Sequence, residues 1–145
     1  MIERYGDLFT TESKHIGHGV NIRGVMGAGI AKTFRSKFPE MYKQYRLACI
    51  REELDVGQDL MLEENDIFIH NISSQEYPGA DALYIWLRRG LEAAMQNVES
   101  VGGDMLALPE IGCGIGGLEW KSVKTFMEEA EENHPAVTLE VWHYV

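Results

Sequence analysis

The sequence has little cysteine, little positive charge and no long apolar run. Its two cysteines, Cys49 and Cys113, are too few for a disulfide framework and do not have metal-ligand spacing. No apolar run approaches membrane-spanning length, and no basic stretch followed by an apolar one opens the chain. We therefore expect no membrane segment, no signal peptide, no metal, no other cofactor and a cytoplasmic location.

Basic residues are outnumbered by acidic ones, with 13 Lys and Arg against 23 Asp and Glu and a formal net charge of −10. Sequence-independent nucleic-acid binding needs clustered Lys and Arg, so the charge argues against that class. An acidic protein that binds an anion must use local N–H groups and helix ends rather than its overall field. Four glutamates late in one predicted helix are expected to be solvated: Glu128, Glu129, Glu131 and Glu132.

The length of 145 residues suits one domain over residues 1–145. Strands are expected at 1–4, 15–20, 59–62, 67–71, 105–108 and 137–144, and helices at 27–38, 39–53, 80–98 and 120–132. Leu83 and Leu87 are expected on the buried stripe of the third helix. This alternation predicts an α/β fold with a mixed, mostly parallel sheet and helices on both faces. Ligands bind such sheets outside the carboxyl ends of the strands.

The strongest motif is the glycine-rich run from Gly112 to Gly117, which follows the apolar run 105–108 and precedes a predicted helix. Glycines leave backbone N–H groups uncovered, and a helix N-terminus favours negative charge, so the run is typical of a phosphate or diphosphate site. It is not a Walker loop, because the terminal Gly-Lys-Ser/Thr is missing. The alternative is a tight turn that binds nothing.

A second glycine cluster, from Gly24 to Gly29, also precedes a helical pattern. Two such loops in one small domain predict a ligand whose diphosphate is held from both sides. Asn21 lies just upstream, and its amide can donate to and accept from ribose hydroxyls. Close packing at a helix start is the alternative explanation of these glycines.

Three single residues carry further hypotheses. Asp7 could accept a hydrogen bond from the exocyclic amine of adenine, or could simply cap a turn. His18 could be a general acid or base, or a structural histidine. Cys113 has no neighbouring His or Lys to lower its pKa, so we interpret it as a small loop residue.

At these positions the chain resembles the macrodomains, an ADP-ribose-binding family with a three-layer α/β/α fold. The matching segments, in family order, are 6–8, 18–21, 24–31, 108–120 and the closing 141–145. The subgroup it resembles contains terminal ADP-ribose protein glycohydrolase and the yeast ADP-ribose phosphate phosphatase. The resemblance implies catalytic roles for His18 and Asn21. His18, or a water positioned by the ligand, would transfer the proton, and Asn21 would orient the sugar. It implies that ADP-ribose is bound by Asp7, Leu8, Asn21, Gly27, Ala28, Gly29, Ile30, Gly112, Cys113, Gly114, Ile115, Gly116 and Gly117.

Two departures from the glycohydrolase pattern bear on catalysis. The loop after the middle strand, residues 71–77, contains no lysine, and Gly116 stands where that enzyme has an aspartate. A covalent route through a lysine is therefore not available to this chain. Three functions stay open: hydrolysis of ADP-ribose phosphate or of ADP-ribosyl linkages, non-catalytic recognition of ADP-ribose as a reader or sensor, and a subunit that acts through protein contacts while its glycine loops are vestigial. The expected partner is ADP-ribose or an ADP-ribosylated molecule, and the expected oligomeric state is a monomer.

Overall fold

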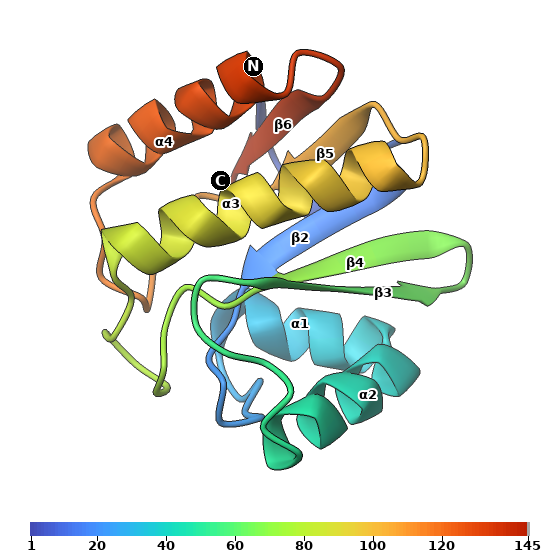
Figure 1. Cartoon of the computed structure of the whole chain (residues 1–145), viewed down its shortest axis with the longest axis vertical. Helices are drawn as coiled ribbons and strands as arrows, with labels where there is room; N and C mark the ends of the chain where they lie inside the picture. Colours follow the sequence, from blue (N-terminus) through green and yellow to red (C-terminus); the bar gives the residue numbers. More distant parts are fainter. Residues whose placement is uncertain (145) are drawn as a thin grey trace.

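The protein consists of a six-stranded sheet between two pairs of helices, as a computed structural model of residues 1–144 shows (Figure 1). Helices α1 and α2 cover one face of the sheet, and α3 and α4 cover the other. The elements in chain order are β1 (Ile2–Tyr5), the short 3-10 helix η1 (Leu8–Thr10), β2 (His15–Gly19), α1 (Gly29–Lys37), α2 (Pro39–Ile50), β3 (Asp59–Glu64), β4 (Ile67–Ile72), α3 (Tyr84–Ser100), β5 (Met105–Leu108), α4 (Trp120–Asn133) and β6 (Thr138–His143). The predicted three-layer α/β/α architecture is thus confirmed.

The strands lie in the order β1-β6-β5-β2-β4-β3. All neighbouring pairs are parallel except β3 and β4, which form an antiparallel hairpin. The carboxyl ends of the five parallel strands therefore face one edge of the sheet, and the loops that follow them meet there. No helix within residues 1–144 is long and apolar enough to cross a membrane.

Two apolar cores, one on each face, hold the layers together. Leu91 and Met127 of α3 and α4 pack on one face with Leu139 of β6. Phe34 and Tyr45 of α1 and α2 pack on the other with Ile69 of β4. Strand β5 is almost wholly buried because it lies in the middle of the sheet and is covered on both faces.

Two details of the sequence prediction are wrong. The third helix begins at Tyr84 rather than at residue 80, and Leu83 is 46% exposed. The peptide N–H of Leu83 instead donates to Ser74 O at 3.1 Å, which holds the chain extended before the helix. The late glutamates are not all merely solvated, because Glu131 accepts a hydrogen bond from the peptide N–H of Leu139 at 2.9 Å.

Candidate functional site

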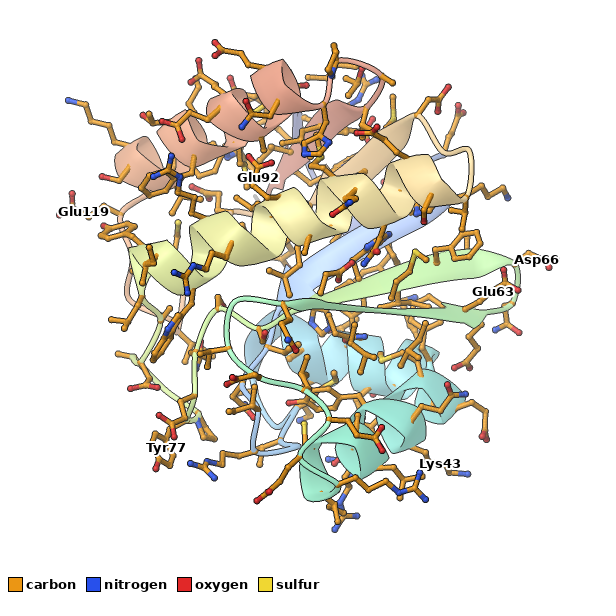
Figure 2. All side chains as sticks on the ribbon, in the orientation of Figure 1. Lys43, Glu63, Asp66, Tyr77, Glu92 and Glu119 are labelled. Carbon is orange, nitrogen blue, oxygen red and sulfur yellow. The ribbon has the colours of Figure 1, made fainter. Side chains whose placement is uncertain are left out.

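A cavity of about 1160 Å³ opens at the carboxyl edge of the sheet. The loops after β1, β2, β4 and β5 contribute to it, together with the end of β6. In Figure 2, Tyr77 in the loop after β4 and Glu119 before α4 lie at this end, whereas Glu63 and Asp66 mark the β3–β4 turn at the opposite end. Within the described residues, the lining contains no Lys, Arg or His. Any anion held here must therefore be bound by backbone N–H groups and by uncharged side-chain donors.

The late glycine loop presents uncovered peptide N–H groups to this cavity. Its fold is fixed by a hydrogen bond from Leu118 N to Gly112 O at 2.9 Å, and Gly112 adopts a positive φ of 76°. Within residues 1–144, four peptide N–H groups of this loop donate to no protein acceptor: those of Gly112, Gly114, Ile115 and Gly116. These groups can surround a phosphate oxygen.

Gly116 cannot be replaced without changing this loop. A Cβ atom at this position would lie 2.6 Å from Gly112 O and 3.1 Å from Ala82 Cβ. The backbone oxygen cannot move aside as a flexible side chain would. The loop conformation itself therefore excludes the aspartate that the glycohydrolase pattern has at this position.

The early glycine loop ends at the N-terminus of α1, which has no side-chain cap. Ala28 is the N-cap residue, and within the described chain the peptide N–H groups of Ala28, Gly29 and Ile30 have no protein acceptor. Unpaired N–H groups at a helix start and the aligned peptide dipoles both favour negative charge. The Ile115 side chain lies against Gly29, 3.1 Å from the position of a Cβ there, so the two glycine loops approach each other.

Asn21 lines the cavity but uses its side chain mainly to hold the early loop. Its Nδ2 donates to Val25 O at 2.8 Å, and its Oδ1 accepts from Arg23 N at 2.9 Å. The Tyr45 hydroxyl donates to the Asn21 carbonyl oxygen at 2.6 Å. Contact between this amide and a sugar stays a prediction.

Asp7 lies at the other end of the cavity, after β1. Its Oδ1 accepts a hydrogen bond from Phe9 N at 3.0 Å, so it caps the 3-10 helix as the structural alternative proposed. The side chain is also exposed and lines the cavity beside Trp142. The capping bond fixes the carboxylate, and contact with a base is compatible with it.

His18 does not reach the cavity. The side chain is fully buried, and its ring stacks on Phe34 with ring centroids 3.8 Å apart. Its Nε2 lies 2.8 Å from Asn71 Oδ1. Burial lowers the pKa of His18 to about 4, although the hydrogen bond to Asn71 acts in the opposite direction. The ring is neutral at physiological pH and has no path to a ligand in this arrangement, so the geometry favours the structural alternative.

Cys113 lines the cavity but is not arranged as a nucleophile. Burial, followed by the Glu110 carboxylate, raises the pKa of the Cys113 thiol to about 11. The thiol is therefore protonated at neutral pH. Among residues 1–144, no group of three or more His, Cys, Asp or Glu side chains is placed to hold a metal ion.

The structure brings nearly all of the predicted ligand residues to one cavity. Of them, Gly117 alone does not line it, and its positive φ of 86° serves the turn into Leu118. Sequence reasoning missed Ser74, Gln75 and Trp142, which also line the cavity. The position of Ser74 and Gln75 after a strand was a usable signal, because every loop at the carboxyl edge is a candidate.

These features define an α/β domain in which two glycine loops with unpaired backbone N–H groups border one cavity at the carboxyl edge of the sheet. The model of the family described as Macro domain matches residues 18–127, and the chain belongs to this family.

Comparison with known proteins gives similar sequences and a similar structure. A DNA ADP-ribosyl glycohydrolase of Mycobacterium tuberculosis is 28% identical over 141 residues, which are 94% of this chain and 40% of that protein. Human ADP-ribose glycohydrolase OARD1 is 27% identical over 128 residues, which are 88% of this chain and 81% of OARD1. The macrodomain of Mycobacterium tuberculosis DarG superposes with a TM-score of 0.90 at 28% identity and covers 97% of both chains. The chain thus spans about 40% of the length of the DNA ADP-ribosyl glycohydrolases it matches.

Proposed function

We propose that this macrodomain binds ADP-ribose and hydrolyses the bond that links the distal ribose to an acceptor. The observation that carries the proposal is the pair of glycine loops with unpaired N–H groups, which line one cavity where the described residues place no basic side chain. A diphosphate is the anion that two such loops fit. The names of the relatives, which are ADP-ribosyl hydrolases, support the same ligand.

The strand order supports one direction for the ligand along the cavity. Asp7 after β1 and Trp142 of β6 lie at one end of the cavity and suit the adenine. The loops after β5 and β2 come next along the edge and would hold the diphosphate between them. The distal ribose would then lie at the β4 end, beside Ser74 and Gln75.

Hydrolysis would proceed by attack of water on the anomeric carbon. The oxygen of water forms the new bond to that carbon, the bond to the acceptor breaks, and a proton passes from the water to the acceptor. The contribution of the chain is to bind the diphosphate and to hold the distal ribose in a reactive orientation. No lysine lies in the loop after β4 and no side chain is present at Gly116, so a covalent lysine route is not proposed.

A non-catalytic reader of ADP-ribose is the second candidate, and one observation favours it. The side chains expected around the distal ribose, Ser74, Gln75 and Asn21, are uncharged. His18, the expected proton donor or acceptor, is separated from the cavity by its burial. A reader would use the same cavity without turnover.

Calorimetric titration with ADP-ribose tests binding. A parallel titration with ADP, which lacks the distal ribose, is the comparison. Incubation with ADP-ribosylated DNA, ADP-ribosylated protein and ADP-ribose phosphate then tests turnover. Binding with release of the acceptor from one substrate is the expected result. Binding without turnover of all three would establish the reader, and absence of ADP-ribose binding would refute both.

We also propose a monomer with one domain over residues 1–145 and a cytoplasmic location. The absence of nucleic-acid binding is a further proposal, which rests on the net charge of −10. It concerns unmodified nucleic acid. An ADP-ribosyl group on DNA would still be recognised through the ADP-ribose.

A further inference from the structure

Ser74 presents a polar group that the fold leaves unused. The residue follows β4, lines the cavity and is fully buried. Among the described residues, its Oγ has no hydrogen-bond partner. A buried hydroxyl without a partner is unfavourable in the unliganded protein, which points to a partner supplied by a ligand.

The backbone of Ser74 is held firmly on both sides. Its peptide N–H donates to Ile72 O at 2.9 Å, and its carbonyl oxygen accepts from Leu83 N at 3.1 Å. These bonds fix the backbone position from which the hydroxyl extends, at the wall of the cavity. Neighbouring Ser73 differs, because its Oγ donates to Asp55 O at 2.6 Å and accepts from Gln58 N at 2.9 Å.

Gly19, the last residue of β2, packs closely against this hydroxyl. A Cβ on Gly19 would lie 2.8 Å from Ser74 Oγ, 3.2 Å from Ile111 Cγ1 and 3.7 Å from the peptide nitrogen of Gly112. Two unpaired polar groups, a hydroxyl and a peptide N–H, thus border the same small space where β2, β4 and β5 end. A ligand oxygen that enters this space can bond to the hydroxyl.

We propose that Ser74 Oγ binds a hydroxyl group of the distal ribose and positions the sugar for reaction. The inference rests on the proposed function, since it uses the direction that the strand order gives to ADP-ribose. Ser74 lies at the β4 end of the cavity, away from Asp7 and Trp142, so its contact is with the part of the ligand that ADP lacks.

The test compares ADP-ribose with ADP as ligands of Ser74→Ala. Loss of one hydrogen bond is expected to weaken ADP-ribose binding about five- to tenfold and to leave ADP binding within about twofold. The melting temperature of the unliganded variant is expected to stay equal or to rise, because the substitution removes an unpaired buried hydroxyl.

Ser73→Ala is the matched control. It removes a hydroxyl that is paired and does not line the cavity, so it should lower the melting temperature and leave both affinities unchanged. Gly19→Ala supplies an independent test, because its methyl group would fill the space beside Ser74 Oγ and should also weaken ADP-ribose more than ADP.

The inference about Ser74 is overturned if Ser74→Ala binds ADP-ribose as tightly as wild type, or if it loses the same affinity for ADP-ribose and for ADP. In either case, binding of ADP-ribose by the wild-type protein would leave the proposed function standing. If the wild-type protein itself bound no ADP-ribose, both would fall. A selective loss of ADP-ribose binding with retained melting temperature supports the contact.

Discussion

Replacement of His18 by glutamine is expected to make the protein less sensitive to acid without removing its function. Glutamine does not titrate, and its side-chain amide can still donate to Asn71 Oδ1 in place of the ring Nε2. It cannot reproduce the stacking on Phe34, so some stability is lost at every pH. The informative quantity is the slope of stability against pH.

The size of the effect follows from the pKa of His18. Burial lowers this pKa from 6.5 to about 4 in the folded protein, whereas in the unfolded chain it returns to its ordinary value. Between these two values the unfolded state binds more protons, so stability falls as the pH falls through this window. At 1.36 kcal/mol per unit, the shift corresponds to a loss of about 3 kcal/mol between pH 7 and pH 4. That is a large part of the stability of a typical domain.

Urea denaturation of both proteins at several values between pH 7 and pH 4 measures this loss. Burial also lowers the pKa of His15 to about 4, so wild type and variant share a second acid-sensitive group. We expect the wild-type free energy of unfolding to fall by about 3 kcal/mol more than that of His18→Gln. If the free energy of unfolding fell equally in both proteins, this prediction would be refuted, because His18 would then not titrate between pH 7 and pH 4.

The same variant tests the catalytic hypothesis for His18. Because the His18 side chain does not line the cavity, the ADP-ribose affinity of His18→Gln at pH 7 should stay within about twofold of wild type. Turnover should stay within the same range. A fall in turnover with unchanged affinity would restore the catalytic hypothesis and contradict the structural role.

Three further predictions concern the ligand loops. Gly116→Ala should lower ADP-ribose affinity more than about tenfold in calorimetry, because its Cβ would lie 2.6 Å from a backbone oxygen. The matched control is Gly114→Ala, whose Cβ would meet no atom within 4 Å and which should bind like wild type. Asp7→Ala should weaken ADP and ADP-ribose about equally, since both carry adenine; a selective loss of ADP-ribose binding would reverse the proposed direction. Cys113→Ser should retain turnover at neutral pH, because the raised pKa keeps the Cys113 thiol protonated and the wild-type protein has no thiolate nucleophile there. A Cys113→Ser variant that folds well but is inactive would contradict this.

The general fold could be predicted from the sequence because its signals are local. Apolar runs, helical stripes and glycine clusters can each be recognised within a short stretch of the sequence. The direction of a parallel strand then determines which edge its loop joins, and Asp7 and both glycine loops do line one cavity at that edge. The helix start at Tyr84 was missed because long-range contacts to Ser74 and Gly116 hold residues 82 and 83 out of the helix.

The role of each polar side chain was decided only by tertiary contacts. His18 follows a strand pattern that gives no sign of which helix will cover it, and its burial results from packing against Phe34 of α1. Ser74 is an ordinary serine in the sequence, and its hydroxyl became a candidate contact only when the structure showed it buried without a hydrogen-bond partner among the described residues. The sequence by itself determined where backbone N–H groups would be uncovered, because that depends on missing side chains. Only the tertiary structure decided which side chains would be covered, since burial and unpaired hydrogen-bonding groups depend on residues far apart in the chain.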